Sequence, residues 1–190
     1  MSATGRGAKR HADDFYATPG WTTRSILPIL AKNLSYIKSP KILEPGAGEG
    51  AIVTECRAYW PKSIIHAVEI DKDRCDAIKN ADVTCCDDYL DPNIIISRDY
   101  DLIITNPPFK LALPFIEQSL KRAKLVCMLL RINFLGSQRR YQFWKENPCG
   151  VFVLPKRPSF TGGSTDATEY AWFVWGFGLN NYWDVLEFLP

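Results

Sequence analysis

The first regular pattern in the chain is an apolar repeat between residues 21 and 37. Apolar side chains recur every three or four residues, at Ile26, Leu27, Leu30, Leu34 and Ile37. This spacing predicts an amphipathic helix that starts near Thr22 or Thr23. Pro28 lies inside the pattern and predicts a kink or a later start, because proline removes a backbone donor.

After this helix, short apolar runs alternate with segments of helical periodicity. The runs that predict strands are 41–43, 64–70, 83–85, 102–105 and 125–130, and the predicted helices are 49–60, 72–79, 111–122 and 137–145. Two β-rich runs, 151–154 and 170–176, are joined without a helical pattern, which predicts an antiparallel hairpin. The predicted fold is therefore α/β: a doubly wound, mostly parallel sheet of seven strands with helices on both faces and a C-terminal antiparallel hairpin.

Length and composition predict a single domain. The chain has 190 residues, of which 46% are hydrophobic and 23% charged, as in an ordinary compact domain. Residues 1–14 lack apolar periodicity, so we expect a flexible basic tail before one domain spanning 15–190. No run approaches the ~18 apolar residues of a membrane span, and the N-terminus lacks a secretory h-region. We expect a cytoplasmic protein without membrane contact.

The net charge and the cysteine content give weak information about partners and metal sites. The formal net charge is +2, too small to identify a nucleic-acid-binding protein, although the basic surplus lies in residues 106–190. Six cysteines without a C-x-x-C pair and only two histidines make a metal site unexpected and predict reduced thiols.

A glycine-rich turn, EPGAGEGA, begins at Glu44 and leads into a predicted helix. Such a turn lets a ligand approach the backbone at the C-terminal end of a strand. Gly46, Gly48 and Ala51 also fit the dinucleotide fingerprint G-x-G-x-x-G/A, and Glu69 stands where that fingerprint places its ribose-binding acid. A nicotinamide-dependent oxidoreductase is therefore one hypothesis.

Two acidic residues beside the turn favour a different cofactor. Glu44 and Glu49 would repel a pyrophosphate. S-adenosylmethionine has no phosphate and carries an ammonium and a sulfonium, which these carboxylates would attract. Glu44 is then a candidate acceptor for the amino group, or else a helix-dipole partner or a solvated loop acid. For Glu49, in the first helical turn, the structural interpretation is favoured.

Acidic residues also end the next two predicted strands. The carboxylate of Glu69 can accept hydrogen bonds from both ribose hydroxyls of either cofactor, whereas Asp71 is predicted to cap the following helix. After the third strand, either Asp87 or Asp88 is placed to accept from an adenine amino group. The other would be a surface or capping residue.

The most specific motif is Asn106-Pro107-Pro108-Phe109, which ends the buried strand 102–105. Neither proline has an N–H to donate, so the turn is stiff and rich in acceptors. The Asn106 side-chain oxygen and the Pro107 carbonyl can accept two hydrogen bonds from one amino group. They would stabilise the positive charge that develops as the nitrogen attacks a methyl group, while a base stacks on Phe109.

On these motifs, residues 15–109 resemble the S-adenosylmethionine-dependent methyltransferases that act on exocyclic amino groups, most closely DNA adenine-N6 methyltransferases of the small phage type. The resemblance implies the class I methyltransferase fold. It assigns cofactor contacts to Tyr16, Thr18 and Pro19 of the sequence FYATP, to Glu44, Gly46 and Gly48, to Glu69 as the ribose acid and to Asp88 rather than Asp87. It also makes Asn106, Pro107, Pro108 and Phe109 the catalytic tetrad.

The same tetrad serves RNA adenine and protein glutamine methylation in related families, so both remain alternatives to DNA. A catalytically silent binding subunit is a further alternative, which the intact tetrad disfavours. We expect no separate target-recognition domain in a chain of this length, so short basic loops with aromatic residues would contact nucleic acid. The candidate nucleic-acid-binding residues are Arg139, Arg140, Lys156, Arg157 and Phe160. A solvated basic surface is the alternative interpretation of these loops.

Overall fold

The computed structural model describes residues 17–160, 167–176 and 186–189. The described strands are β1 (Lys41–Pro45), β2 (Ile64–Glu69), β3 (Val83–Cys86), β4 (Tyr100–Thr105), β5 (Ala123–Arg131), β6 (Gly150–Val153), β7 (Tyr170–Trp175) and β8 (Leu186–Phe188). The helices are α1 (Gly20–Asn33), α2 (Ala51–Tyr59), α3 (Lys72–Ala77), α4 (Ala112–Leu120) and α5 (Tyr141–Glu146), with short 3-10 turns η1 (Phe109–Leu111), η2 (Ile132–Phe134) and η3 (Gln138–Arg140). The expected tail, residues 1–14, and Tyr16 lie outside the described residues.

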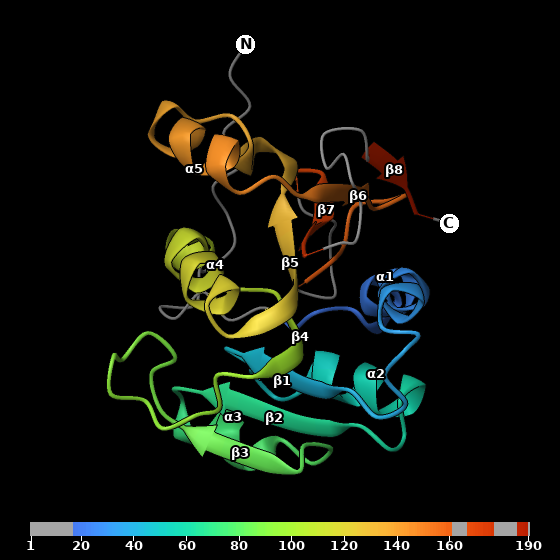
Figure 1. Cartoon of the computed structure of the whole chain (residues 1–190), viewed down its shortest axis with the longest axis vertical. Coiled ribbons are helices and arrows are strands. Elements are labelled where there is room, and N and C mark those ends of the chain that lie inside the picture. The colour runs from blue at the N-terminus through green and yellow to red at the C-terminus, as the bar shows by residue number, and fades with distance from the viewer. Residues whose placement is uncertain (1–16, 161–166, 177–185, 190) are drawn as a thin grey trace.

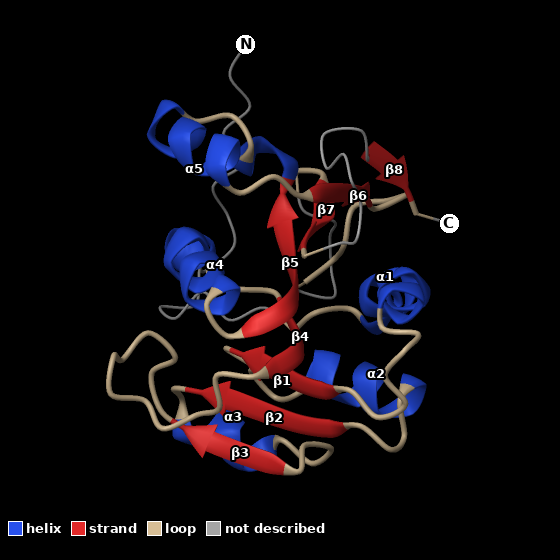
Figure 2. Ribbon diagram, viewed as in Figure 1, coloured by secondary structure: helices blue, strands red, loops and turns tan. Residues whose placement is uncertain are grey.

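All eight strands belong to one sheet, in the order β3-β2-β1-β4-β5-β7-β6-β8 (Figure 2). Neighbours from β3 to β5 are parallel, and β7 lies antiparallel between β5 and β6. The mostly parallel sheet with a C-terminal antiparallel hairpin is therefore confirmed. The sequence did not predict β8, a three-residue strand that pairs parallel to β6, because so short a run carries no periodicity.

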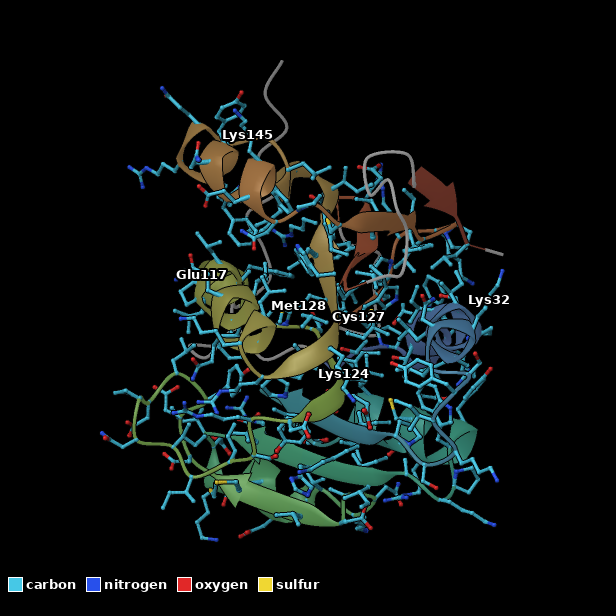
Figure 3. All side chains as sticks on the ribbon, viewed as in Figure 1. Lys32, Glu117, Lys124, Cys127, Met128 and Lys145 are labelled. Carbon is cyan, nitrogen blue, oxygen red and sulfur yellow. The ribbon has the colours of Figure 1, made fainter. Side chains whose placement is uncertain are left out.

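Helices cover both faces of the sheet, as predicted. α1 and α2 lie on one side and α4 on the other (Figure 1). The side chains of β5 alternate between the two resulting core layers, so the adjacent residues Cys127 and Met128 point to opposite sides (Figure 3). No helix in the described part of the chain is long and apolar enough to cross a membrane.

α1 begins earlier than its apolar pattern predicts. The helix starts at Gly20, because the Thr22 backbone N–H and hydroxyl both donate to the Pro19 carbonyl, at 3.0 and 2.8 Å. The expected later start caused by Pro28 is wrong. Pro28 lies inside the helix on its exposed side, where water can bind the carbonyl that loses its helical partner.

α1 is fixed to the sheet from the distant β7 strand. The indole N–H of Trp172, which is fully buried, donates to the Thr22 carbonyl at 2.8 Å. This contact joins residues 150 positions apart in the sequence. It holds the start of α1, and the segment just before it, against the sheet near the ends of the central strands.

We expect Gly176→Ala to destabilise the fold by about 2–4 kcal/mol. Gly176 directly follows β7 and has a φ of +79°, and a Cβ atom there would overlap the backbone carbonyl of Lys124. Gly136→Ala is the matched control, because its Cβ atom would meet only the Asn133 carbonyl at 3.9 Å. Urea unfolding of both variants measures the effect, and equal midpoints would contradict it.

Candidate functional site

A cavity of about 850 Å³ opens where β1, β2 and β4 end. Ten residues that sequence analysis selected line it: Thr18, Glu44, Gly46, Gly48, Glu69, Asp88, Asn106, Pro107, Pro108 and Phe109. They converge because parallel strands end at the same edge of a sheet, where the order reverses between β1 and β4. Pro19, also selected, is not among the lining residues. It is the N-cap residue of α1.

The glycine turn between β1 and α2 has a backbone that only glycine adopts readily. Gly46, Gly48 and Gly50 have φ values of +64°, +56° and +82°, in the left-handed region. A Cβ atom on Gly46 would lie 3.4 Å from the Phe115 ring, and one on Gly50 would lie 3.1 Å from the Ile78 side chain. The glycines therefore let the turn pass between α3, α4 and the cavity.

Glu69, at the end of β2, holds this turn in place. Its side chain is buried, with Oε2 accepting from the Gly48 backbone N–H at 2.7 Å and Oε1 accepting from the Asp71 backbone N–H at 3.0 Å. The Arg74 guanidinium lies 3.7 Å from the same carboxylate. A carboxylate has about four acceptor positions, so each oxygen can take one more hydrogen bond from a ligand. The Asp71 carboxylate caps α3 by accepting from the Arg74 backbone N–H, as predicted.

Glu44 is buried at the end of β1, and its carboxylate supports α2. Oε2 accepts from the Val53 backbone N–H at 2.8 Å, so one oxygen acts as the helix-dipole partner that sequence analysis left open. Burial raises the pKa of Glu44 well above its ordinary value, and the nearby charge of Glu69 raises it further. Glu49 is exposed and lies before α2, which begins at Ala51 with Gly50 as its N-cap, so the prediction that Glu49 stands in the first helical turn is wrong.

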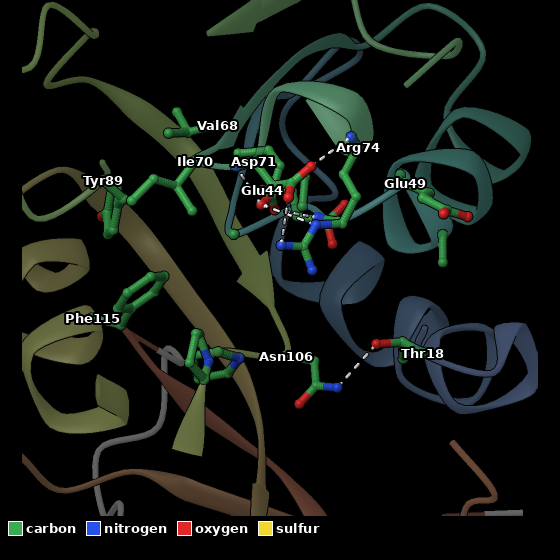
Figure 4. Close-up of a pocket in the computed structure, with 18 of the residues that line it drawn as sticks. Thr18, Glu44, Glu49, Val68, Ile70, Asp71, Arg74, Tyr89, Asn106 and Phe115 are labelled. Atoms are coloured by element: carbon green, nitrogen blue, oxygen red, sulfur yellow. Dashed lines mark hydrogen bonds and ion pairs between the residues drawn. The ribbon is translucent and has the colours of Figure 1, made fainter. Parts of the chain in front are cut away.

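Asn106 has one satisfied and one unsatisfied end. Its Nδ2 donates to Thr18 Oγ1 at 3.1 Å (Figure 4). Its Oδ1 is buried and accepts no hydrogen bond from the described residues. An unpaired buried acceptor costs about 1–3 kcal/mol, and such atoms are rare in folded proteins. This unsatisfied acceptor therefore marks a place where a hydrogen-bond donor of a ligand is expected to bind.

The turn that carries Asn106 is tied directly to the glycine turn. The Thr105 hydroxyl, at the end of β4, donates to the Pro45 carbonyl, at the end of β1, at 2.7 Å. Both groups are buried. The link holds the two turns in register at the edge of the cavity, so a ligand on one turn lies next to the other.

Phe109 lies under a cation. The guanidinium carbon of Arg131 is 4.4 Å from the centre of the Phe109 ring, within cation–π range. Arg131 Nε also donates to the Tyr170 hydroxyl at 3.0 Å. The arginine therefore occupies one position over the ring where sequence analysis expected a base to stack, and it brings positive charge beside the motif.

None of the five predicted nucleic-acid-binding residues lines the cavity. Arg139 is exposed, whereas Arg140 donates to the Phe134 carbonyl at 2.8 Å and covers the Phe134 ring. Arg157 forms an ion pair with Glu169. Lys156 lies 5.0 Å from the centre of the Trp21 ring, and Phe160 packs against Tyr170 with ring centres 5.2 Å apart. Their contact with nucleic acid remains a prediction.

Several lining residues were not selected from the sequence. Ile70 is 67% exposed and follows Glu69 directly, so an apolar residue after the acidic strand end was the available signal. Tyr89 and Phe115 pack together with ring centres 5.1 Å apart and form an aromatic wall. Nothing in their local sequence distinguishes them from core residues. Within the described residues, no group of three potential ligands lies close enough to hold a metal ion.

Comparison with known proteins places the fold in one structural class. A structure described as a class I S-adenosylmethionine-dependent methyltransferase from Listeria monocytogenes superposes with a TM-score of 0.71 at 16% identity, covering 94% of this chain and 65% of that one. A protein from Pyrococcus horikoshii described as an RNA methyltransferase gives 0.67 at 19% identity, covering 93% and 92%. These superpositions show that the chain has the class I methyltransferase fold.

The sequence itself matches a curated protein over a shorter stretch. It is 32% identical over 89 residues to a release factor glutamine methyltransferase from Flavobacterium psychrophilum. The match covers 43% of this chain and only 31% of that protein. No family model matches the chain.

Proposed function

We propose that this chain is an S-adenosylmethionine-dependent methyltransferase that acts on the exocyclic N6 amino group of adenine in DNA. The observation that carries this proposal is the buried, unpaired Oδ1 of Asn106 at the cavity edge. An amino group supplies the donor that this oxygen lacks, and the adjacent Pro107 carbonyl is the second acceptor. The class I fold and its cavity support the same reaction class.

The residues of the cavity fit this cofactor. Six acidic and two basic side chains line the described cavity, which suits a cationic ligand and disfavours the pyrophosphate of a nicotinamide cofactor. Glu69 would bind the ribose hydroxyls, Asp88 the adenine amino group, Glu44 the ammonium and Thr18 the carboxylate. When bound, S-adenosylmethionine supplies a methyl group on a positively charged sulfur.

The Asn106–Phe109 turn would accelerate methyl transfer by electrostatic stabilisation of the substrate nitrogen. Asn106 Oδ1 and the Pro107 carbonyl would each accept one hydrogen bond from the substrate amino group. These bonds oppose delocalisation of its lone pair and stabilise the positive charge that the nitrogen acquires. The two prolines keep the acceptors fixed before the substrate arrives, so little reorganisation is needed.

Positive charge beside the motif favours a nucleic acid. Arg131 stacks on Phe109, and the exposed Lys110 lines the cavity. Both would attract a phosphate backbone near the point where a flipped base enters. A glutamine side chain is the second candidate substrate, because its amide also presents a delocalised NH2 group. The similarity to a release factor glutamine methyltransferase supports that candidate.

Parallel labelling separates the substrates. The purified chain is given S-adenosylmethionine with a labelled methyl group, together with duplex DNA, RNA or a protein extract in separate reactions. We expect label in DNA, recovered as N6-methyladenine after nuclease digestion. Label only in RNA or only in protein would replace DNA by that substrate, and no label in any reaction would contradict the proposed activity.

The raised pKa of Glu44 predicts proton release when the cofactor binds. Burial favours the neutral carboxyl, whereas a bound ammonium favours the ionised form, so binding lowers this pKa. Affinity for S-adenosylhomocysteine, which carries the same ammonium, should rise as the pH rises above the ordinary glutamate range and should level off once the pH exceeds the raised pKa of Glu44. Calorimetry in buffers of different ionisation enthalpy measures the released proton. Glu44→Gln should abolish the release, and unchanged release in that variant would exclude Glu44 as its source.

A further inference from the structure

Thr18 joins the predicted cofactor region to the predicted catalytic side chain. It lies two residues before α1, is 8% exposed and lines the cavity. Its Oγ1 accepts from Nδ2 of Asn106, a residue 88 positions away in the sequence (Figure 4). Nδ2 of the Asn106 amide is therefore engaged, while the opposite end of the same amide is the unpaired Oδ1.

The orientation of this amide decides whether it can hold an amino group. With Nδ2 on Thr18, Oδ1 is the atom left for a substrate, and it can accept from an NH2 group. A rotation of the amide by 180° would turn Nδ2 toward the substrate instead. Two donors would then face each other, and both the attraction and the stabilisation of positive charge would be lost.

A hydroxyl cannot by itself select one orientation. Thr18 Oγ1 can accept from Nδ2, as in this structure, or it can donate to Oδ1 of a rotated amide. The choice depends on where the hydroxyl proton goes. If another acceptor takes that proton, the oxygen is left to accept, and only Nδ2 can face it.

The geometry points to Thr18 as a positioning residue that sets the orientation of the Asn106 amide when the cofactor binds. With the cofactor bound, the Thr18 hydroxyl would donate its proton to the carboxylate of S-adenosylmethionine, while its oxygen accepts from Asn106 Nδ2 as in this structure. Oδ1 is thereby kept facing the substrate amino group. This inference rests on the proposed function. It adds a connection between cofactor binding and substrate binding, which follows neither from the cofactor contact of Thr18 alone nor from the substrate contact of Asn106 alone.

Kinetics with duplex DNA test the functional consequence. Thr18→Val keeps the shape of the side chain but removes the hydroxyl, and we expect kcat to fall about 10- to 100-fold with a smaller change in the KM for DNA. Thr18→Ser should restore kcat to within about threefold of the parent, because it restores the hydroxyl. Thr23→Val is the matched control, since the buried Thr23 hydroxyl has no partner among the described residues, and its kcat should equal that of the parent. A Thr18→Val variant with the parent kcat would overturn the inference.

A second measurement does not depend on turnover. Hydrogen exchange of the Asn106 side-chain NH2 group, followed by NMR, should slow when S-adenosylhomocysteine binds. The decarboxylated analogue should not slow it, and in the Thr18→Val variant S-adenosylhomocysteine should not slow it either. Equal slowing by the two ligands would overturn the role of the carboxylate. If the parent methylates none of the offered substrates, the proposed function fails, whereas this exchange experiment still decides the Thr18 contact.

Discussion

Asn106→Ala should abolish most methyl transfer while leaving the fold and cofactor binding intact. Removing a single preorganised group that stabilises transition-state charge costs about 10²–10³-fold in rate, and we expect at least that loss here. Oδ1 is the acceptor that we propose faces the substrate amino group, and it accepts no hydrogen bond from the described residues. Radiolabel transfer to duplex DNA measures the rate, and calorimetry with S-adenosylhomocysteine measures cofactor affinity.

Thermal unfolding adds an independent expectation for the same variant. A buried acceptor without a partner costs about 1–3 kcal/mol, and Asn106→Ala removes that atom. We therefore expect a melting temperature equal to or above that of the parent, as is common when a strained functional group is deleted. Asn80→Ala is the matched control, because Asn80 Nδ2 also donates to a threonine hydroxyl, Thr54 Oγ1, at 3.0 Å on the exposed surface. A variant that transfers methyl groups at the parent rate would contradict the assignment of Asn106.

The fold could be predicted from the sequence because its signals are local. The run 125–130 is apolar throughout, and the run 102–105 is apolar except for Thr105, which is typical of strands that are buried on both faces. The convergence of Glu44, Glu69 and Asn106 also followed from position alone, since all three lie at the C-terminal ends of parallel strands or directly after one. Neither step required knowledge of a particular contact.

The partners of these side chains could not be predicted in the same way. The Thr18–Asn106 hydrogen bond and the Arg131–Phe109 stacking join positions that are distant in the sequence, and no spacing rule relates them. Counting basic residues also overstates the charge available for nucleic acid, because Arg157 is already paired with Glu169. A sequence identifies the groups that carry chemistry, whereas tertiary packing decides which of them are engaged internally.

Glu69→Gln should weaken S-adenosylhomocysteine binding by about 100-fold, the second large effect that we expect. The parent carboxylate accepts from two backbone N–H groups, those of Gly48 and Asp71, and retains acceptor positions for two ribose hydroxyls. A glutamine amide has one acceptor oxygen, so its NH2 group would face one of the two backbone N–H donors. The hydrogen bond from that backbone donor would be lost, together with the ribose hydrogen bond to the same position of the charged carboxylate. Glu49→Gln is the control, because Glu49 lines the same cavity but is exposed, and its affinity should match that of the parent.

A ligand without the 2′-hydroxyl separates the contact with ribose from the support of the glycine turn. If Glu69 binds the ribose, the parent should bind 2′-deoxy-S-adenosylhomocysteine about 10- to 100-fold more weakly than S-adenosylhomocysteine, because a hydrogen bond to a charged group contributes about 1.5–3 kcal/mol. Glu69→Gln should then bind the two ligands with nearly equal affinity, since the partner of that hydroxyl is already impaired. If Glu69 only supports the turn through Gly48, both forms of the protein should show the same ratio between the two ligands. Equal ratios would therefore remove Glu69 from the ribose contact and leave it with the structural role alone.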